Sequence, residues 1–87
     1  MDFSDALREI KSGRRMTRRG WNAPGQFVFH VPGSAFRVNR PPLLGIYGRG
    51  TEVNYHDHVD LRTARGQIEP WTPTQGDLFA SDWEGAE

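Results

Sequence analysis

The segment from Trp71 to Trp83 constrains the fold more than any other part of the sequence. It reads Trp-Thr-Pro-Thr-Gln-Gly-Asp-Leu-Phe-Ala-Ser-Asp-Trp. Thr74 and Asp77 have the spacing of a capping box, in which two side chains three residues apart accept backbone N–H groups at a helix start. A single turn with residues 78–80 buried is expected to follow. Each tryptophan adds a large apolar area and an N–H that needs a partner. The segment therefore indicates a corner of the core or a binding surface for a flat ring.

The small size of the chain limits how it can be stabilised. With 87 residues and no cysteine, it has room for one domain, residues 1–87, and cannot use disulfides or a thiolate metal site. Oligomerisation is the remaining common way to bury more surface. The sequence contains no apolar run of membrane-spanning length and no basic leader. We therefore expect an intracellular, cytoplasmic protein that forms a homo-oligomer and needs no cofactor.

The charges are unevenly distributed although the net charge is zero. Residues 1–50 carry nine Lys or Arg and three Asp or Glu residues, whereas residues 51–87 carry two and eight. The halves can pair with each other, and part of the basic half can also face an anionic ligand. A dedicated DNA-binding protein normally has a surplus of positive charge. The zero net charge therefore argues against a dedicated DNA-binding protein.

The periodicity of the sequence predicts an α+β fold. Apolar residues at 3, 6, 7 and 10 form one face of an amphipathic helix that Asp2 caps and Gly13 ends. An alternating pattern predicts a strand at residues 26–31, and shorter strands are expected within residues 14–19, which alternate poorly, and 35–38. Residues 58–63 and 67–71 are expected to form a hairpin. Together these give an N-terminal helix, a four- to five-stranded antiparallel sheet and a short C-terminal helical turn. The glycine-rich segment 40–57 is expected to be a long loop that packs on a partner subunit or closes over a ligand.

The run Arg18-Arg19-Gly20-Trp21-Asn22 combines groups that suit a nucleotide. Arginine offers a planar donor fork for phosphate, tryptophan a stacking plane, and asparagine a donor–acceptor pair for a base or ribose edge. A core tryptophan flanked by solvated arginines explains the same run, and composition alone favours that interpretation. Asp77 also has two interpretations. It either serves only as the acid of the capping box or, together with Gln75, contacts a ligand.

Signals for metal binding and catalysis are weak. His56 and His58 point the same way on an extended segment, but no third ligand is evident, so no metal site is predicted. The sequence contains no phosphate-cradling loop, no nucleophile elbow and no His-Glu-x-x-His motif. We therefore expect a binding protein and not an enzyme.

Several of these features occur together in one known family. They are an apolar helix ending at a glycine, the run at residues 18–22, and Pro-Trp-Thr-Pro-Thr-Gln-Gly-Asp-Leu-Phe-Ala-Ser-Asp-Trp at residues 70–83. In this order and spacing they resemble a small phage and bacterial domain family that includes the Thoeris anti-defence 2 proteins. The resemblance covers roughly residues 2–34 and 58–84, and the middle of the chain does not match.

The resemblance implies a function in immune evasion. A member of that family would bind and sequester a cyclic ADP-ribose-type signal (glyco-cyclic ADP-ribose) without cleaving it, form homo-oligomers such as dimers or tetramers, and in some cases hold cyclic oligonucleotides. The residues expected to contact the signal are Arg18, Arg19, Trp21, Asn22, Trp71, Gln75 and Asp77. Two alternatives remain on the residues alone: a protein-interaction module with an aromatic surface, and a single-stranded nucleic-acid binder using residues 14–21.

Overall fold

The computed structural model of the chain describes residues 1–86. In chain order the elements are α1 (Phe3–Lys11), β1 (Met16–Arg18), β2 (Phe27–Val31), β3 (Ser34–Arg37), β4 (Glu52–Tyr55), β5 (His58–Arg62), β6 (Ile68–Pro70), α2 (Gln75–Phe79) and β7 (Trp83–Gly85). An N-terminal helix, antiparallel strands and a short C-terminal helix are all present, so the predicted α+β class is confirmed.

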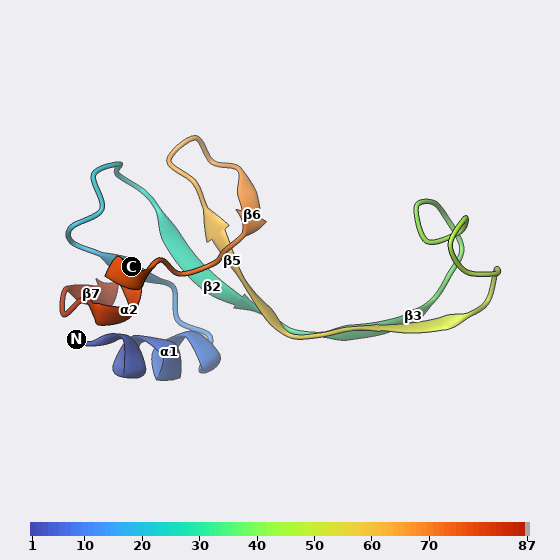
Figure 1. Cartoon of the computed structure of the whole chain (residues 1–87), viewed down its shortest axis with the longest axis horizontal. Coiled ribbons are helices and arrows are strands. Elements are labelled where there is room, and N and C mark those ends of the chain that lie inside the picture. Colours follow the sequence, from blue (N-terminus) through green and yellow to red (C-terminus); the bar gives the residue numbers. More distant parts are fainter. Residues whose placement is uncertain (87) are drawn as a thin grey trace.

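The strands form two antiparallel sheets that share one long hairpin (Figure 1). The larger sheet has the order β6-β5-β2-β1-β7, and the smaller consists of β3 and β4. Two residues separate β2 from β3, and two separate β4 from β5, so the smaller sheet continues the central hairpin of the larger one. We call residues 1–31 and 58–86 the head and residues 32–57 the arm. The arm projects from the head, and the molecule measures 46 × 26 × 24 Å.

The helix α1 has the N-cap, the buried face and the terminating glycine that the sequence predicts. Asp2 is its N-cap and accepts a hydrogen bond from the backbone N–H of Asp5 at 2.9 Å. Ala6 and Ile10 form its buried face. Gly13 follows the helix with φ of 102°, a conformation that strains any residue with a Cβ. The helix is therefore fixed at both ends and packs through one apolar stripe.

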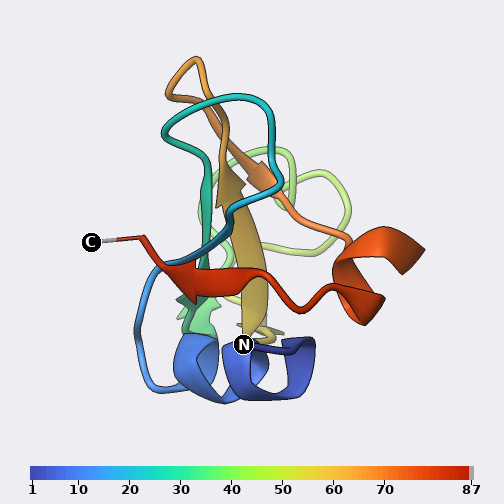
Figure 2. The same ribbon diagram turned by 90° about the vertical axis from the view of Figure 1, so that its left-hand side faces the viewer.

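The core of the head lies where α1 meets the larger sheet. Its fully buried residues are Ala6, Ile10, Met16, Val28 and Trp83. They come from α1, β1, β2 and β7, so segments from both ends of the chain are joined in one cluster. Figure 2 shows α1 and β7 close together, with the N-terminus beside them. The first and last elements of the described chain therefore stabilise each other.

The central strand β2 alternates as predicted. Val28 is buried and lies opposite Leu61 of β5. Phe27 and Phe29 lie on the other face, where their ring centroids are 5.9 Å apart. The guanidinium of Arg15 lies 5.3 Å from the centre of the Phe27 ring. One face of the strand is thus packed on the core, and the other carries a partly exposed aromatic pair.

The hairpin predicted within residues 58–71 is confirmed. β5 and β6 pair in an antiparallel register that sets Arg62 opposite Ile68. The turn contains Gly66 with φ of 85°, and the backbone N–H of Thr63 donates to the carbonyl oxygen of Gln67 at 2.8 Å. A glycine at this position lets the chain reverse without strain.

The prediction of one continuous loop over residues 40–57 is wrong. Part of this segment forms β4, which pairs with β3 in a register that sets Ser34 opposite Tyr55. Only residues 38–51 form the loop at the tip of the arm. The alternation in β4 spans four residues, and its partner lies across a glycine-rich stretch. A pattern that short does not identify a strand without knowledge of its partner.

The C-terminal segment also differs from the prediction in two respects. Residues 78–80 do not form a buried turn: Leu78 is 38% exposed and Phe79 is 82% exposed. Because α2 has five residues, only one side of it packs on the head, and Asp77 takes that place. The second difference is β7, which pairs with β1 and sets Trp83 opposite Arg18.

Candidate functional site

The capping box at the start of α2 has the predicted geometry. Thr74 is the N-cap, and its side-chain oxygen accepts from the backbone N–H of Asp77 at 3.1 Å. The carboxylate of Asp77 accepts in return from the backbone N–H of Thr74 at 2.9 Å. Asp77 is only 5% exposed. A buried carboxylate must be compensated, so its remaining contacts determine the local structure.

Arg18 on β1 supplies that compensation. Its Nη1 donates to Asp77 Oδ1 at 2.8 Å, and its Nε donates to Asp82 Oδ1 at 2.9 Å. Asp82 Oδ2 also accepts from the backbone N–H of Gly20 at 2.7 Å. A Cβ at Gly20 would lie 2.7 Å from that carboxylate oxygen, so a side chain there would displace Asp82. One arginine therefore joins β1 both to α2 and to the loop between α2 and β7.

Two of the tryptophans donate hydrogen bonds to Asp77, one to its carboxylate and one to its backbone oxygen. Trp21 Nε1 donates to Asp77 Oδ1 at 3.2 Å, and Trp83 Nε1 donates to the backbone oxygen of Asp77 at 3.0 Å. The ring of Trp83 lies at the centre: Trp21 is 5.4 Å away edge-on, and Trp71 is 6.0 Å away edge-on. Trp83 is 2% exposed, whereas the other two are half-buried. Trp83 is thus a core residue, and Trp21 and Trp71 flank it nearer the surface.

The hydrogen bonds within the cluster stabilise the charged forms of Asp77, Asp82 and Arg18. Burial by itself raises the pKa of the Asp77 carboxyl, but hydrogen bonds from Thr74, Arg18 and Trp21 outweigh it, and its pKa lies below the ordinary value. Hydrogen bonding from Arg18 likewise lowers the pKa of Asp82. The same bonds to Asp82 and Asp77 raise the pKa of Arg18. All three groups remain ionised at neutral pH, so one guanidinium is shared by two carboxylates and the three groups together carry a net charge of −1.

The predicted contact residues therefore divide into two groups. Arg18, Trp21 and Asp77 are brought together, with Trp71 close by, but their polar groups are bonded to each other. Arg19, Asn22 and Gln75 are exposed. Arg19 has a 3.5 Å ion pair with Glu84, and its side chain is 79% exposed. Among residues 1–86, the side chains of Asn22 and Gln75 have no hydrogen-bond partner, so they are available to a ligand.

The sequence reasoning missed two contributors to this cluster. Asp82 shares Arg18 with Asp77, as described above. The amino group of Met1 donates to the backbone oxygen of Trp83 at 2.7 Å, and the backbone N–H of Trp83 donates to the backbone oxygen of Met1 at 3.1 Å. The position of Asp82 beside Trp83, at the end of the motif in residues 70–83, was the one signal in the sequence that could have identified it. Nothing in the sequence pattern indicated the role of Met1.

The histidines lie at the base of the arm and beside it. His30 Nε2 is 2.6 Å from Asp57 Oδ2, and the other carboxylate oxygen accepts from the backbone N–H of Gly33 at 2.9 Å. Both hydrogen bonds lower the pKa of the Asp57 carboxyl, the bond from Gly33 more than the bond to His30. His58 Nε2 lies 3.3 Å from Asp60 Oδ1. Within residues 1–86, no group of three or more potential ligands is arranged to hold a metal ion.

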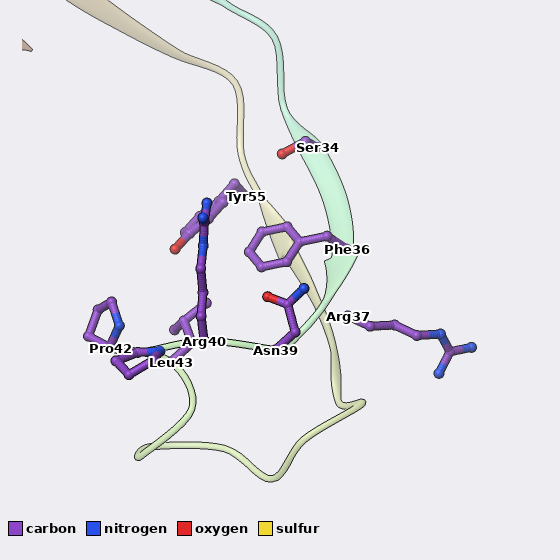
Figure 3. Close-up of a pocket in the computed structure, with 9 residues that line it drawn as sticks. Ser34, Phe36, Arg37, Asn39, Arg40, Pro42, Leu43 and Tyr55 are labelled. Carbon is purple, nitrogen blue, oxygen red and sulfur yellow. The ribbon is translucent and has the colours of Figure 1, made fainter.

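The largest described hollow lies on the arm, away from the tryptophans. It measures about 960 Å³. Its lining residues are Ser34, Phe36, Arg37, Asn39, Arg40, Pro41, Pro42, Leu43 and Tyr55. Figure 3 shows Phe36, Tyr55 and Arg40 gathered around it, while Arg37 points away. The arm extends away from α2 and β7 (Figure 1), so it does not cover the C-terminal cluster of its own chain.

Comparison with known proteins connects this geometry to a family. The model of the Thoeris anti-defense 2-like domain matches residues 1–85. The chain belongs to the Thoeris anti-defense 2-like family. Thoeris anti-defense 2 of Bacillus phage SP01 is 31% identical over 87 residues, which cover 97% of this chain and 92% of that protein. The predicted resemblance is confirmed, and it extends through the middle segment that the motifs left unmatched.

Membership of the Thoeris anti-defense 2-like family assigns the chain an anti-defence role. The matched region contains the whole capping box, the Arg18 cluster and the arm. Neither helix in residues 1–86 has the length and apolar character of a membrane span.

Proposed function

We propose that this chain blocks Thoeris-type immunity by sequestering a cyclic ADP-ribose-type signal, with glyco-cyclic ADP-ribose as the ligand, in the bacterial cytoplasm where that signal would act. The observation that carries the proposal is the family match over residues 1–85. The relative from a Bacillus phage supports it, because its name describes action against Thoeris. Cyclic oligonucleotides are a second ligand class to titrate against the same protein.

The chain holds its signal without cleaving it. A general base must have a free oxygen or nitrogen near the substrate. In the C-terminal cluster the Asp77 and Asp82 carboxylates are already bonded to Arg18, at 2.8 and 2.9 Å, and their pKa values are lowered. These acids are poor bases in that state. The cluster is suited to holding rings in place, which supports a binding protein.

The contact surface would be built on the cluster and completed by its exposed neighbours. Trp21 or Trp71 offers a ring face for the purine, and Arg19 offers a guanidinium for the pyrophosphate. Asn22 and Gln75 have unused donors and acceptors for ribose and base edges. In this scheme Arg18 and Asp77 position the tryptophans and do not contact the signal themselves.

Tight retention requires that a second chain close over this surface. Nanomolar binding corresponds to about −12 kcal/mol, and a drug-sized ligand supplies roughly 0.3 kcal/mol per heavy atom only when most of it is buried. The three hollows described in the chain are lined by other residues. We therefore expect a homo-oligomer, a dimer or tetramer, with the signal between subunits.

Calorimetric titration with glyco-cyclic ADP-ribose tests the proposal. The account predicts nanomolar binding that weakens at least roughly tenfold in Trp71→Ala and in Arg19→Ala, because each removes a direct contact. Arg8→Ala is the matched control, since Arg8 is also an exposed, ion-paired arginine. Unchanged binding in both test variants would place the site elsewhere, and no binding by the intact protein would remove the signal from the proposal.

A protein-interaction module is the second candidate, and the tip of the arm favours it. Ile46 is 69% exposed and Tyr47 is 49% exposed. Large exposed apolar groups on a projecting loop are typical of contact surfaces. Substituting both with serine would abolish a protein contact there while leaving a head-bound signal unaffected, so the same titration separates the two candidates.

A further inference from the structure

Two short linkers join the arm to the head. Residues 32–33 connect β2 to β3, and residues 56–57 connect β4 to β5. Within residues 1–86, the strands β3 and β4 contact each other but no other helix or strand. The arm therefore stands clear of the head, as Figure 1 shows, and the linkers determine its direction.

The antiparallel ladder is interrupted at these linkers. On one side of the hairpin it stops at Val31 and resumes at Ser34. Between them Pro32 has no N–H, and the N–H of Gly33 donates to the carboxylate of Asp57 instead of to a backbone oxygen. No backbone hydrogen bond joins the two linkers in the described part of the chain. The linkers are therefore the level at which the hairpin bends most easily, since hinges form at a few residues at the ends of elements.

One carboxylate bridges the interruption. Asp57 Oδ1 accepts from the Gly33 N–H at 2.9 Å, and Asp57 Oδ2 lies 2.6 Å from Nε2 of His30, which belongs to β2 in the head. The side chain of Asp57 is 67% exposed, so water and other donors can compete for both bonds. The carboxylate therefore ties the second linker to the first and to the head through bonds that can open.

The close approach of the linkers depends on Gly33. A Cβ at this position would lie 2.5 Å from the backbone oxygen of Tyr55 and 2.8 Å from Asp57 Oδ1. Both distances are shorter than real Cβ contacts, and one partner is a backbone atom that cannot rotate away. A larger residue would push the linkers apart and strain the bonds of Asp57.

A hollow of about 330 Å³ beside the clamp leaves room for movement. From α1, Leu7, Ile10 and Lys11 line it, and Lys11 is the charged residue among them. The opposite lining contains His30, Asp57, His58 and Val59. The base of the arm can tilt towards this space without displacing the core residues of the head.

We propose that the two linkers form a hinge and that the Asp57 carboxylate is the clamp that fixes its angle. While both bonds are made, the arm keeps the extended direction of Figure 1. When the clamp opens, the arm swings about residues 32–33 and 56–57, and the core between α1 and the larger sheet stays intact. The clamp thus determines where the tip of the arm can reach. This device does not depend on the proposed signal or on the residues assigned to it.

A spin-label distance measurement tests the hinge, because the chain has no cysteine to interfere with labelling. Labels are attached at Ser4→Cys on α1 and Ile46→Cys at the tip of the arm, both exposed positions. The labelled chain is diluted with unlabelled chain, so that only distances within one chain contribute, and is measured by double electron–electron resonance. The proposal predicts a narrow distribution at neutral pH, which Asp57→Ala and Gly33→Ala each widen at least roughly twofold.

The matched control is Asp60→Asn. Asp60 also pairs with a histidine, His58 at 3.3 Å, but it lies within β5 and outside the linkers. This variant should keep the narrow distribution, and thermal melting should show that the head is folded in all variants. A distribution as narrow in Asp57→Ala and Gly33→Ala as in the doubly labelled chain alone would overturn the clamp. So would equal widening in Asp60→Asn, or a broad distribution before any of these substitutions is made.

Discussion

The head and the arm use their polar and aromatic groups in opposite ways. In the head, Arg18 and the N–H groups of Trp21 and Trp83 all bond to Asp77, and the Trp83 ring is buried. In the arm, a single fully buried residue, Val38, holds the loop, while aromatic rings and Arg40 face outward. The comparison teaches that the stability of the fold is concentrated in the bonded groups at the centre of the head, whereas the arm contributes little to it. It predicts that substitutions of buried groups lower stability more in the head than in the arm.

The largest effect is expected at the centre of the head. Asp77→Ala removes the capping box and one charge-assisted bond to Arg18 and leaves the N–H of Trp21 unpaired. These losses together predict a decrease of about 3 kcal/mol in the free energy of unfolding. Urea denaturation followed by tryptophan fluorescence measures it. Asp5→Ala, which removes an exposed ion pair with Arg8, should change stability by less than about 0.5 kcal/mol.

Acid should destabilise the head through the same carboxylates. Because the pKa values of Asp77 and Asp82 are lowered in the folded state, their contribution is complete above the unfolded value of about 3.9 and is lost as pH falls through the folded values. The thermal midpoint should therefore be steady from pH 7 to about 5 and fall steeply below about 4. In Asp82→Asn that fall should be shallower. An equally steep fall in both proteins would contradict the assigned role of Asp82.

An intermediate effect is expected in the arm. Val38→Ala removes two buried methyl groups, and the transfer free energy predicts a cost of about 1–2 kcal/mol. Because Val38 is the only fully buried residue of the described arm, this loss should appear as faster amide exchange in residues 34–55 while exchange in α1 stays unchanged. Acceleration of equal size in α1 would show that the arm and the head unfold as one unit.

The smallest effect is expected at the exposed ring of α2. Phe79 is 82% exposed, so Phe79→Ser should change the free energy of unfolding by less than about 0.5 kcal/mol. A matched substitution in the core, Trp83→Leu, should cost several times more, since that ring contacts Phe3, Trp21 and Trp71. Similar costs for the two substitutions would contradict the described packing of the C-terminal segment.

The sequence predicted the features that depend on nearby residues. The Asp2 cap, the Thr74–Asp77 capping box and the hairpin around Gly66 all involve groups a few positions apart, and each is confirmed. The buried face of α1 followed from its 3.6-residue period. The family resemblance was also recognisable because its motifs are contiguous runs.

Features that depend on distant partners were not predictable in the same way. The bond from Arg18 to Asp82 spans 64 positions, and that from Met1 to Trp83 spans 82. The strand β4 could be identified only from its pairing with β3 in the structure. The roles of Arg18 and Asp77 could not be assigned from residue type, because a guanidinium and a carboxylate suit a ligand as well as each other. Their mutual burial is what gives them a structural role.

The retention of an intact signal tests the central claim most directly. Purified protein is incubated with glyco-cyclic ADP-ribose, freed of unbound ligand, heat-denatured, and the released material is identified by chromatography and mass spectrometry. The account predicts stoichiometric release of unmodified signal, with a ratio to chains that gives the number of subunits sharing each site. Release of a cleaved product would show an enzyme, and release of no ligand would show that this chain does not sequester the signal.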